Sequence, residues 1–415
     1  MSKTVVDCLF RDVSLTRQAL NSYDDFVSRI VPEVVETHRP IEVSPQMFSG
    51  GQHKIWLNNL NYDIPSVIEK DNNIRRITPM EARIRDFMYS VPVYVDVHHS
   101  YTSASGNTTT SVKKQIYMAR MPVMVRSSLC VLSKDHCDDF EKRECPHDPG
   151  GYFIVNGREK TLVVQERISP NMVFCFGPSE CIFHSEHNPT THSNSTFRIF
   201  VKKFGFTAFR VTFANVNVEI PFLILYRALG GQEDMLHHYI DPSDVSETIG
   251  DASVATTQES ALKWLADYVE DVPHFLNNMV YPHIGTNSKM KCLQMCIQWA
   301  EYIHCLKNDN GKNDNVYHDR DHVRAKRLDT AGAMLGTLFS HLFFQMLRNI
   351  RKDAQALADK NKTIRPEKLI QPQHITDGIK YALATGNWKI KGSSYAGRVG
   401  VSQLLNRNTY ISCIS

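Results

Sequence analysis

Apolar positions near the start of the chain recur with a helical period. Between Val13 and Val35 they fall on one face of a helix, which predicts an amphipathic helix there. A second helix start is indicated at Thr78, because threonine can cap a helix, Pro79 fits its first turn and Glu81 can close a capping box. The first part of the chain therefore contains at least two helices.

Alternating apolar and polar residues then predict strands. Val91–Val97 and Lys113–Val125 have strand character, and Tyr101–Ser111 between them is a Ser/Thr/Gly-rich segment that we expect to be a loop. Further along, Asp148–Gly151 has turn chemistry. The Asn156-Gly157 pair follows, flanked by two β-rich runs, and predicts a tight β-hairpin.

The pattern changes at about Asn171. Strand-like pieces dominate up to Tyr226 and enclose a polar, histidine-bearing loop at Ser185–Ser195. Helices are predicted at Ser260–Val269 and Lys289–Leu306, and the polar segment Lys307–Asn315 indicates a boundary.

A long helix is predicted from about Leu328 to Asp359, with apolar residues on one stripe. Ile364-Arg365-Pro366 ends that helix. Helices and strands alternate irregularly and no repeat of fixed period is present, so the fold class predicted is α+β rather than a wound parallel sheet.

Composition narrows the class of protein. The 415 residues suggest two or three domains, and the mixture of 42% apolar and 22% charged residues is typical of globular proteins. The net charge of +3 names no partner, so a nucleic-acid surface would have to be a local patch. Charged residues interrupt the apolar runs at the start, and no apolar run is long enough for a bilayer, so we expect neither secretion nor a membrane span.

Candidate metal sites are weak in the sequence. Ten cysteines occur without a CxxC pair, and we expect reduced thiols. One group has two thiols and two imidazoles: Cys175, Cys181, His184 and His187. Its spacing matches no usual zinc finger or ribbon, so we favour a polar loop beside two buried thiols. Cys292 and Cys296 share one helix face, and we expect them in the core.

A second cluster mixes imidazoles and carboxylates: His318, Asp319, Asp321 and His322. It could be a metal or acid–base site, which leaves a metal-dependent hydrolase as one hypothesis. We favour a solvated loop, because the basic segment Arg324–Arg327 can pair with these carboxylates without a metal. The usual nucleotide-binding, zinc-protease and serine-hydrolase motifs are missing.

The C-terminal segment is basic, since no acidic residue follows Asp377. Its lysines and arginines suit phosphates, its serine and amide side chains suit sugar or phosphate oxygens, and its glycines allow close approach of the backbone. Composition alone leaves nucleic-acid contact and a solvated loop equally open.

Several longer motifs occur in a distinctive order. They are Ala119–Ser127, Glu144–Lys160, Val164–Arg167, Tyr226–Gly230, Tyr281–Ile284, Asp319–His322, Lys326–Gly332, Tyr381–Trp388 and Gly400–Arg407. Together they closely resemble the second-largest (β-type) subunit of multisubunit DNA-directed RNA polymerase, nearest to the eukaryotic polymerase II type and its relatives in large DNA viruses. The resemblance covers nearly the whole chain.

The resemblance implies an architecture. Residues 1–170 and 326–385 would form the protrusion, 171–325 an inserted lobe, and 386–415 the start of the fork. The chain stops where the family continues, and we expect either a fragment or one half of a split subunit.

It also implies a function. The chain would form one wall of the DNA cleft and contact the RNA–DNA hybrid during transcription. It would be part of a nucleotidyltransferase complex but lack catalytic residues and cofactors of its own. The Mg²⁺ would be held mainly by the largest subunit, and the family's Zn²⁺ site would lie in the missing C-terminal part.

Partners and location follow from the same resemblance. The partners would be the largest subunit, the rest of the second-largest subunit, the smaller subunits, the DNA template and the hybrid. The location would be the nucleus, or a virion or cytoplasmic viral factory. The alternative is a stand-alone nucleic-acid-binding or assembly protein derived from this subunit.

The implied nucleic-acid contacts lie in the last thirty residues, at Gln403, Asn406, Arg407, Asn408, Arg398 and Lys391. Gln403 would donate to RNA phosphate or sugar, the next three would occupy the same wall, and Arg398 and Lys391 would neutralise backbone charge. The run Tyr395–Val399 departs from the family pattern, so the basic contact is open. Packing within the fork, without RNA contact, is the alternative for each residue.

Overall fold

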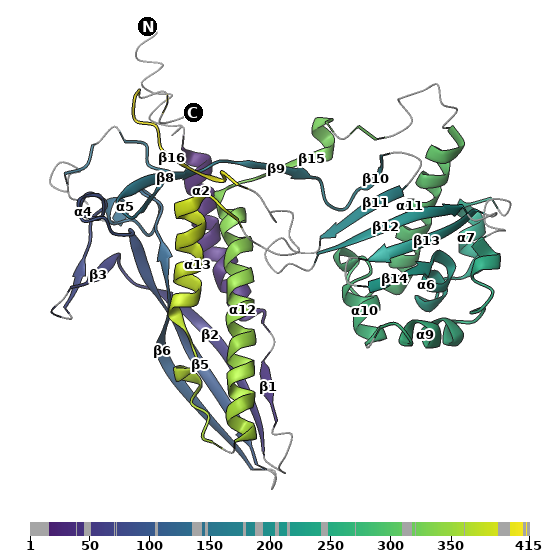
Figure 1. Ribbon diagram of the computed structural model, residues 1–415, viewed down its shortest axis with the longest axis horizontal. Helices are drawn as coiled ribbons and strands as arrows, with labels where there is room; N and C mark the ends of the chain where they lie inside the picture. Colours follow the sequence, from purple (N-terminus) through teal and green to yellow (C-terminus); the bar gives the residue numbers. More distant parts are fainter. Residues whose placement is uncertain are drawn as a thin grey trace. The chain divides into compact units, whose positions relative to one another are not determined.

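The computed structural model divides into two compact units, each with its own hydrophobic core (Figure 1). Unit 1 comprises Met1–Gln165 and Leu328–Ser415, and unit 2 comprises Glu166–Arg327. The structure describes residues 16–38, 40–44, 51–69, 71, 73–103, 107–134, 143–145, 148–176, 180–186, 194–203, 207–213, 216–241, 248–269, 271–308, 318–319, 321–360, 362–388, 399–409 and 412.

Unit 1 is built on an antiparallel sheet. Its strands, in spatial order, are β1 (Ile41–Val43), β2 (Gln52–Tyr62), β5 (Ser90–Thr102) and β6 (Thr108–Pro122). The expected loop Tyr101–Ser111 is wrong in extent, because Thr102 already pairs with Thr108. Its β-branched threonines fit the ladder, so β5 and β6 continue as a long hairpin.

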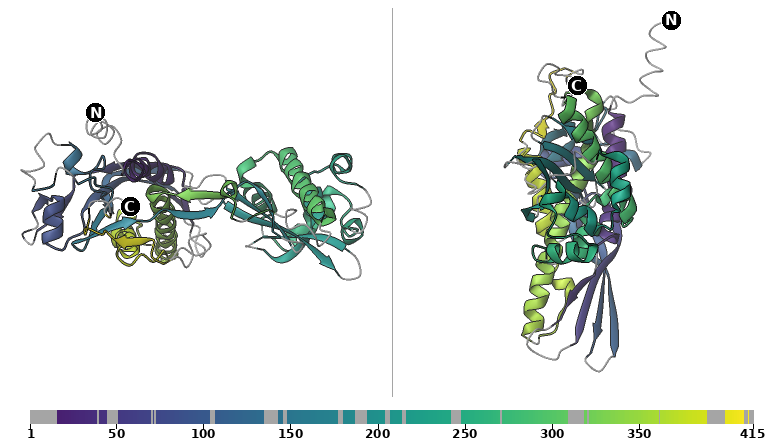
Figure 2. Two further views of the ribbon diagram at one scale, coloured as in Figure 1. Left: turned by 90° about the horizontal axis from the view of Figure 1, so that it is seen from above. Right: turned by 90° about the vertical axis from the view of Figure 1, so that its right-hand side faces the viewer.

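Helices pack against this sheet. The first predicted helix is confirmed from Arg17 onward as α2 (Arg17–Asp25), the π-helical turn η1 (Phe26–Ile30) and α3 (Val31–Glu36). The long helix α12 (Ala331–Asp359) contacts both α2 and α13 (Pro372–Thr385), as Figure 2 shows from above. It begins three residues later than predicted, because Lys326–Asp329 forms strand β15 instead.

Two local predictions in unit 1 are confirmed. Helix α4 (Pro79–Ile84) starts at a capping box, in which the Thr78 hydroxyl accepts from the Glu81 amide at 3.3 Å. Strands β7 (Phe153–Val155) and β8 (Arg158–Leu162) form the predicted hairpin. Asn156 and Gly157 in its turn have φ of 50° and 71°, as a type I′ turn requires. The remaining short elements of unit 1 are β3 (Ser66–Ile68), β4 (Ile74–Arg76), α5 (Val131–Lys134), η4 (Pro366–Lys368) and β16 (Ser402–Leu404).

Unit 2 contains a second antiparallel sheet. Its strands follow the chain order: β10 (Val173–Cys175), β11 (Glu180–Glu186), β12 (Asn194–Lys203), β13 (Thr207–Phe213) and β14 (Val216–Pro221). The prediction of strands up to Tyr226 is wrong at its end, because helix α6 (Phe222–Ala228) starts after Pro221. All seven α6 side chains are buried, so the apolar run reflects burial on every side rather than a strand.

The helices of unit 2 agree with the predictions. The predicted pair is present as α9 (Gln258–Ala266) and α11 (Ser288–Asn308), and α11 packs on β10 and β11. Cys292 and Cys296 are buried in this core, as predicted. The other helices are α7 (Glu233–Tyr239), α10 (Val272–Asn278), η2 (Pro282–Ile284) and η3 (Val323–Ala325). Most of the histidine-bearing loop and of Lys307–Asn315 lies outside the described residues.

The chain passes from one unit to the other through β9 (Gln165–Ile168) and β15 (Lys326–Asp329), which form a two-stranded sheet. Antiparallel sheets with packed helices confirm the α+β class. No helix in the described part of the chain is long and apolar enough to cross a membrane. The names protrusion, lobe and fork for these parts stay predictions.

Candidate nucleic-acid interface

The segment that carries the predicted contacts adds a strand to the β7–β8 hairpin. Strand β16 lies beside β8 (Figure 1), in a sheet with the order β16-β8-β7. Ser402 lies opposite Leu162, and Leu404 lies opposite Lys160. Backbone bonds continue the pairing at both ends: Val163 donates to the carbonyl of Val401 at 2.9 Å, and Leu405 donates to that of Glu159 at 3.1 Å. The hairpin predicted from Asn156-Gly157 is therefore the platform on which this segment lies.

The end of α13 fixes the other side of the segment. Gly386 ends the helix with φ of +74°, and its carbonyl accepts from the Val401 amide at 3.2 Å. A Cβ atom at Gly386 would lie 2.7 Å from the carbonyl oxygen of Ser402, so only glycine allows this approach. The Ser402 hydroxyl donates to the Leu383 carbonyl at 2.7 Å. Val401 and Trp388 are buried in the core of unit 1, so the described part of residues 386–415 packs within that unit.

Gln403 lies on an exposed part of β16. Val401 and Ser402 are buried, whereas Gln403 and Leu404 are exposed. The Gln403 amide nitrogen donates to the carbonyl of Gly400 at 3.3 Å. Because successive side chains of a strand point to opposite faces, Gln403 and Leu404 present a polar and an apolar group on different faces of the same strand.

Arg407 has partners within the chain. Its guanidinium donates two hydrogen bonds to the Glu159 carboxylate, at 2.7 and 2.8 Å, and one to Asp148 at 3.1 Å. It also lies over the ring of Tyr152, 5.0 Å from the centroid. This bidentate, stacked arrangement joins the segment to a strand 248 residues earlier in the sequence.

A second arginine completes the same network. Arg83, on α4, donates to Glu159 at 2.8 Å, to Glu144 at 2.9 and 3.1 Å, and to the Tyr152 hydroxyl at 2.6 Å. The Tyr152 hydroxyl in turn donates to Asp148 at 2.6 Å. We call this set the charged junction: Arg83, Glu144, Asp148, Tyr152, Glu159 and Arg407.

Burial and charge act against each other in the charged junction. Burial alone would raise the pKa of Asp148, but hydrogen bonds from Tyr152 and the Gly150 amide, with the charge of Arg407, lower it below its usual value. Hydrogen bonding to Glu159 raises the pKa of Arg407, and burial raises that of Tyr152. Arg407 therefore stays charged, and Tyr152 stays neutral.

The charged junction has two guanidinium groups and three carboxylates, so it carries a net negative charge. Such a group attracts no phosphate by itself, and its main effect is to hold residues 405–409 against the hairpin. Sequence reasoning missed Arg83, Glu144 and Glu159 as partners of Arg407. The available signal was three separate acidic residues inside the Glu144–Lys160 motif, at positions 144, 148 and 159.

The other predicted contacts have different surroundings. The Asn406 side chain accepts from the backbone amide of Asn408 at 2.9 Å, which shapes an exposed turn after β16. Arg398 and Lys391 lie outside the described residues. The structure thus brings Gln403, Asn406, Arg407 and Asn408 onto one segment, and their contact with nucleic acid stays a prediction.

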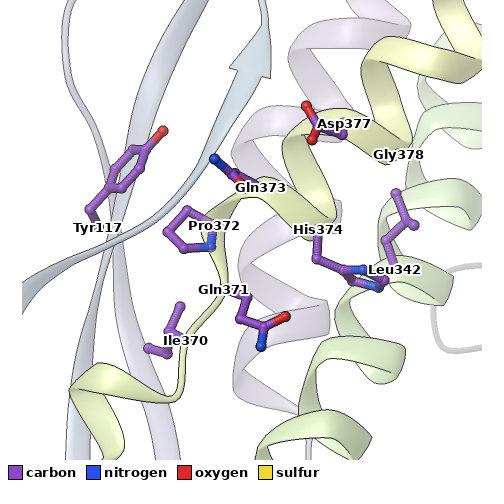
Figure 3. A pocket seen from close by; sticks show the side chains of 9 residues that line it. All are labelled: Tyr117, Leu342, Ile370, Gln371, Pro372, Gln373, His374, Asp377 and Gly378. Atoms are coloured by element: carbon purple, nitrogen blue, oxygen red, sulfur yellow. The ribbon is translucent and has the colours of Figure 1, made fainter.

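Unit 1 also has an open groove of about 770 Å³ away from this segment (Figure 3). Tyr117 of β6 lies on one side, and Gln371, Gln373 and His374 at the start of α13 lie on the other. No lysine or arginine is among its lining residues, so its chemistry does not suit a phosphate backbone.

Comparison with known proteins gives a consistent result. A family model described as RNA polymerase beta subunit matches residues 14–377. DNA-directed RNA polymerase II subunit 2 of Arabidopsis thaliana is 30% identical over 467 residues, which cover 99% of this chain and 38% of that protein. DNA-directed RNA polymerase subunit Rpo2N of Methanococcus vannielii is 29% identical over 448 residues, which cover 100% of this chain and 85% of that protein.

An archaeal relative of a different length gives the same picture. Subunit Rpo2 of the DNA-directed RNA polymerase of Saccharolobus solfataricus is 29% identical over 433 residues, which cover 99% of this chain and 37% of that protein. The chain thus spans about two fifths of the length of the Arabidopsis and Saccharolobus relatives. Eukaryotic and archaeal relatives are equally similar to it.

Proposed function

The chain belongs to the RNA polymerase beta subunit family, and on that premise we propose that it works as the N-terminal part of the second-largest subunit of a DNA-directed RNA polymerase. The observation that carries this proposal is the family match over residues 14–377, together with relatives aligned along 99–100% of the chain. The nucleotidyltransferase activity would belong to the assembled complex.

We further propose that unit 1 serves as the protrusion and unit 2 as the lobe of one wall of the DNA cleft. The insertion of unit 2 between the two parts of unit 1 supports this assignment. The segment 386–415 would begin the fork, held on unit 1 by the charged junction and the end of α13. Partners in this arrangement are the largest subunit, the rest of the second-largest subunit, the smaller subunits, the template and the hybrid.

Gln403 is the residue we propose to touch RNA. Its side chain is exposed, uncharged and able both to donate and to accept, so it suits sugar and phosphate oxygens of any sequence. Arg407 would act differently, as a positioning residue that holds the strand carrying Gln403. Mg²⁺ would be held mainly by the largest subunit, outside this chain.

The comparisons do not distinguish between types of polymerase. A polymerase II or viral type, and with it a nuclear or viral location, stays a prediction, because archaeal relatives match equally well. This does not change the proposed role, which concerns the cleft wall and the path of the RNA.

Site-specific crosslinking tests the proposed contact. A photoreactive amino acid at position 403 in the assembled, transcribing polymerase should label the nascent RNA. The matched control is position 404, which is exposed on the same strand but has a side chain on the opposite face. Equal labelling at both positions, or labelling at 404 alone, would remove the assignment of Gln403.

A further inference from the structure

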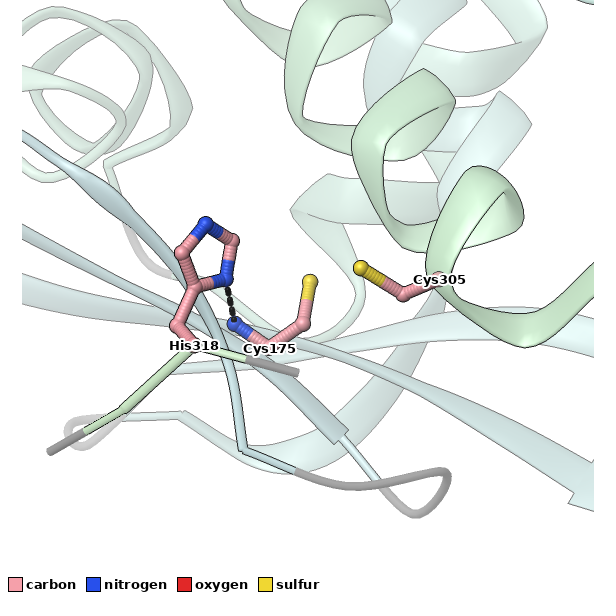
Figure 4. A group of neighbouring side chains, drawn as sticks. All are labelled: Cys175, Cys305 and His318. Atoms are coloured by element: carbon pink, nitrogen blue, oxygen red, sulfur yellow. Dashed lines mark hydrogen bonds between the residues drawn. The ribbon is translucent and has the colours of Figure 1, made fainter. Parts of the chain in front are cut away.

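Three metal-binding side chains from separate parts of unit 2 meet at one edge of its sheet (Figure 4). Cys175 ends strand β10, Cys305 lies in the last turn of α11, and His318 lies beyond that helix. The two sulfur atoms and a ring nitrogen of the histidine all lie within 4.8 Å of one another. We call this group the thiol cluster.

The backbone holds the histidine in the thiol cluster. The amide of His318 donates to the carbonyl of Cys175 at 2.9 Å, and the amide of Cys175 donates to Nδ1 of His318 at 3.1 Å. Figure 4 shows this second bond, with Nδ1 on the side of the ring nearer the two sulfur atoms. Nδ1 therefore carries no proton, but its one lone pair accepts from the Cys175 amide, so a metal ion bound at Nδ1 would replace this hydrogen bond. The hydrogen bond with the Cys175 side chain raises the pKa of His318, so a metal ion would also compete with a proton for the ring.

Burial differs across the thiol cluster. Cys175 and Cys305 are buried, whereas His318 is exposed, so the group is open to solvent from the histidine side. The neighbouring Cys181 thiol and burial raise the pKa of Cys175, and burial raises that of Cys305. Without a cation, both sulfurs are therefore thiols, and the alternative to a metal site is a hydrogen-bonded group of two reduced thiols and an imidazole.

We propose that Cys175, Cys305 and His318 bind one Zn²⁺ ion in unit 2. Two thiolates and an imidazole form a ligand set that zinc favours over the hard cations Mg²⁺ and Ca²⁺. In tetrahedral sites with Zn–S bonds of about 2.3 Å, ligand atoms lie roughly 3.3–3.8 Å apart, so closure needs only small shifts. The fourth position suits water, since His318 is exposed and only these three side chains lie within 4.8 Å of one another in the described part of the chain.

Binding of Zn²⁺ would release two protons from the thiol cluster. Each thiol loses its proton to solvent and becomes a thiolate, and no bond other than S–H is broken and no electron is transferred. The ion would join the last turn of α11 and His318 to strand β10. With three protein ligands and a fourth position open to solvent, the site would differ from closed four-ligand structural sites, and its effect on the fold would come from connecting three elements of one core.

The sequence alone did not group these three ligands. Cys175 and His318 belonged to two separate candidate groups, and Cys305 belonged to neither. The spacing of the first group matched no usual zinc site, and a solvated loop was favoured for the second because nearby basic residues can pair with its carboxylates. The fold brings together residues 143 positions apart, which no local spacing rule covers.

Metal analysis of the full chain tests the proposal. The protein is purified under reducing conditions with added Zn²⁺, freed of loose metal, and its zinc is measured per chain. We expect about one zinc in the wild type and at most about a fifth of that in Cys175→Ser, Cys305→Ser and His318→Asn, since each loses one of three ligands. The matched control is Cys296→Ser, which removes a buried thiol from the same helix and core and should keep the metal.

Spectroscopy with Co²⁺ distinguishes the loss of the metal site from the loss of the fold. Co²⁺ in place of zinc should give thiolate-to-metal absorption and the intense visible bands of a tetrahedral site, and His318→Asn should lose or shift them. His318 is exposed, so this variant should keep the wild-type circular dichroism even where a cysteine variant unfolds.

Three results would overturn the proposal. One is a wild type that takes up neither zinc nor cobalt, and another is zinc that survives all three substitutions. The third is a loss of two titratable thiols that a chelator does not restore but a reductant does, since this would mean a disulfide between Cys175 and Cys305 instead of a metal site.

Discussion

The charged junction in unit 1 and the thiol cluster in unit 2 both connect distant parts of the chain, but with different chemistry. Each fastens a late segment of the chain to a strand far earlier in the sequence: Arg407 to Glu159 across 248 residues, and His318 to Cys175 across 143. The charged junction uses guanidinium and carboxylate groups, and Arg407 remains 40% exposed at its side chain. The thiol cluster uses sulfur and an imidazole, with both sulfurs buried.

This difference predicts which solution conditions should change the stability of each unit. Ion pairs at a partly exposed site weaken as carboxylates are protonated and as salt rises. A thiol group that binds a metal responds instead to chelators and to oxidation. The two units of one chain should therefore lose stability under separate treatments, and measurements that resolve the units can test this difference.

The largest effect is expected from Arg83→Met. Glu144 is only 5% exposed at its side chain and pairs with Arg83, so the substitution leaves a buried carboxylate without this partner. We expect a loss of about 3–5 kcal/mol in the free energy of unfolding of unit 1, as for other broken buried pairs. Chemical denaturation followed by region-resolved hydrogen exchange measures it.

Arg29→Met is the control for that experiment. Arg29 pairs with Asp25 on the exposed surface of a helix, with 58% of its side chain exposed. Its loss should change stability by only about 0.3–0.5 kcal/mol. If both substitutions have the same effect, the charged junction is not the fastening that its geometry indicates.

Removal of the proposed zinc should come next in size. With free zinc at 100 times its dissociation constant, binding stabilises the folded form by about 2.7 kcal/mol, and a chelator removes that amount. The effect should appear in unit 2 and leave the amides of the β7–β8 hairpin in unit 1 unchanged. A chelator that destabilises both units equally would contradict the expectation that only unit 2 depends on the metal ion.

Gly386→Ala should have a smaller effect, confined to unit 1. The substitution forces a Cβ into left-handed backbone and against the Ser402 carbonyl, and we expect a loss of about 1–2 kcal/mol in the free energy of unfolding. Gly250→Ala is the control, because its added Cβ meets no atom within 4 Å. Thermal unfolding of both variants measures the difference, and equal melting temperatures would contradict the tight approach of β16 to α13.

The smallest effect concerns pH. The pKa of Asp148 is lowered in the folded chain, so its contribution is complete above the unfolded value of about 3.9 and is lost as the pH falls through the folded value. The Leu405 amide donates to the backbone carbonyl of Glu159, and its protection, which is its exchange relative to the intrinsic rate at the same pH, should therefore fall below about pH 4 in the wild type. Asp148→Asn should exchange faster already at neutral pH and should show a weaker dependence on acid.

The sequence predicted elements that depend on local signals. The capping box at Thr78, the hairpin at Asn156-Gly157 and the long helix ending at Asp359 all follow from residues close together in the chain. It misjudged β15 and α6, where the packing around a short segment decides its conformation. In particular, the fully buried helix α6 has no polar face from which a period could be recognised.

The candidate site was predictable only in part. The resemblance led to the segment around Gln403, and the hairpin on which this segment lies was visible in the sequence. The partners of Arg407 and the meeting of Cys175, Cys305 and His318 were not, because both depend on contacts between residues far apart in the chain. Opposite charges or compatible ligands in a sequence do not show which of them meet.

Isolation of the chain with its native partners tests whether it works as a polymerase subunit. The chain carries an affinity tag in its own cells, and the recovered material is assayed for its subunits and for template-dependent RNA synthesis with Mg²⁺. The account predicts recovery with a largest polymerase subunit, and RNA synthesis in the same fraction. A chain that elutes alone near 47.4 kDa, with no polymerase subunit and no RNA synthesis, would contradict it and favour a stand-alone binding or assembly protein.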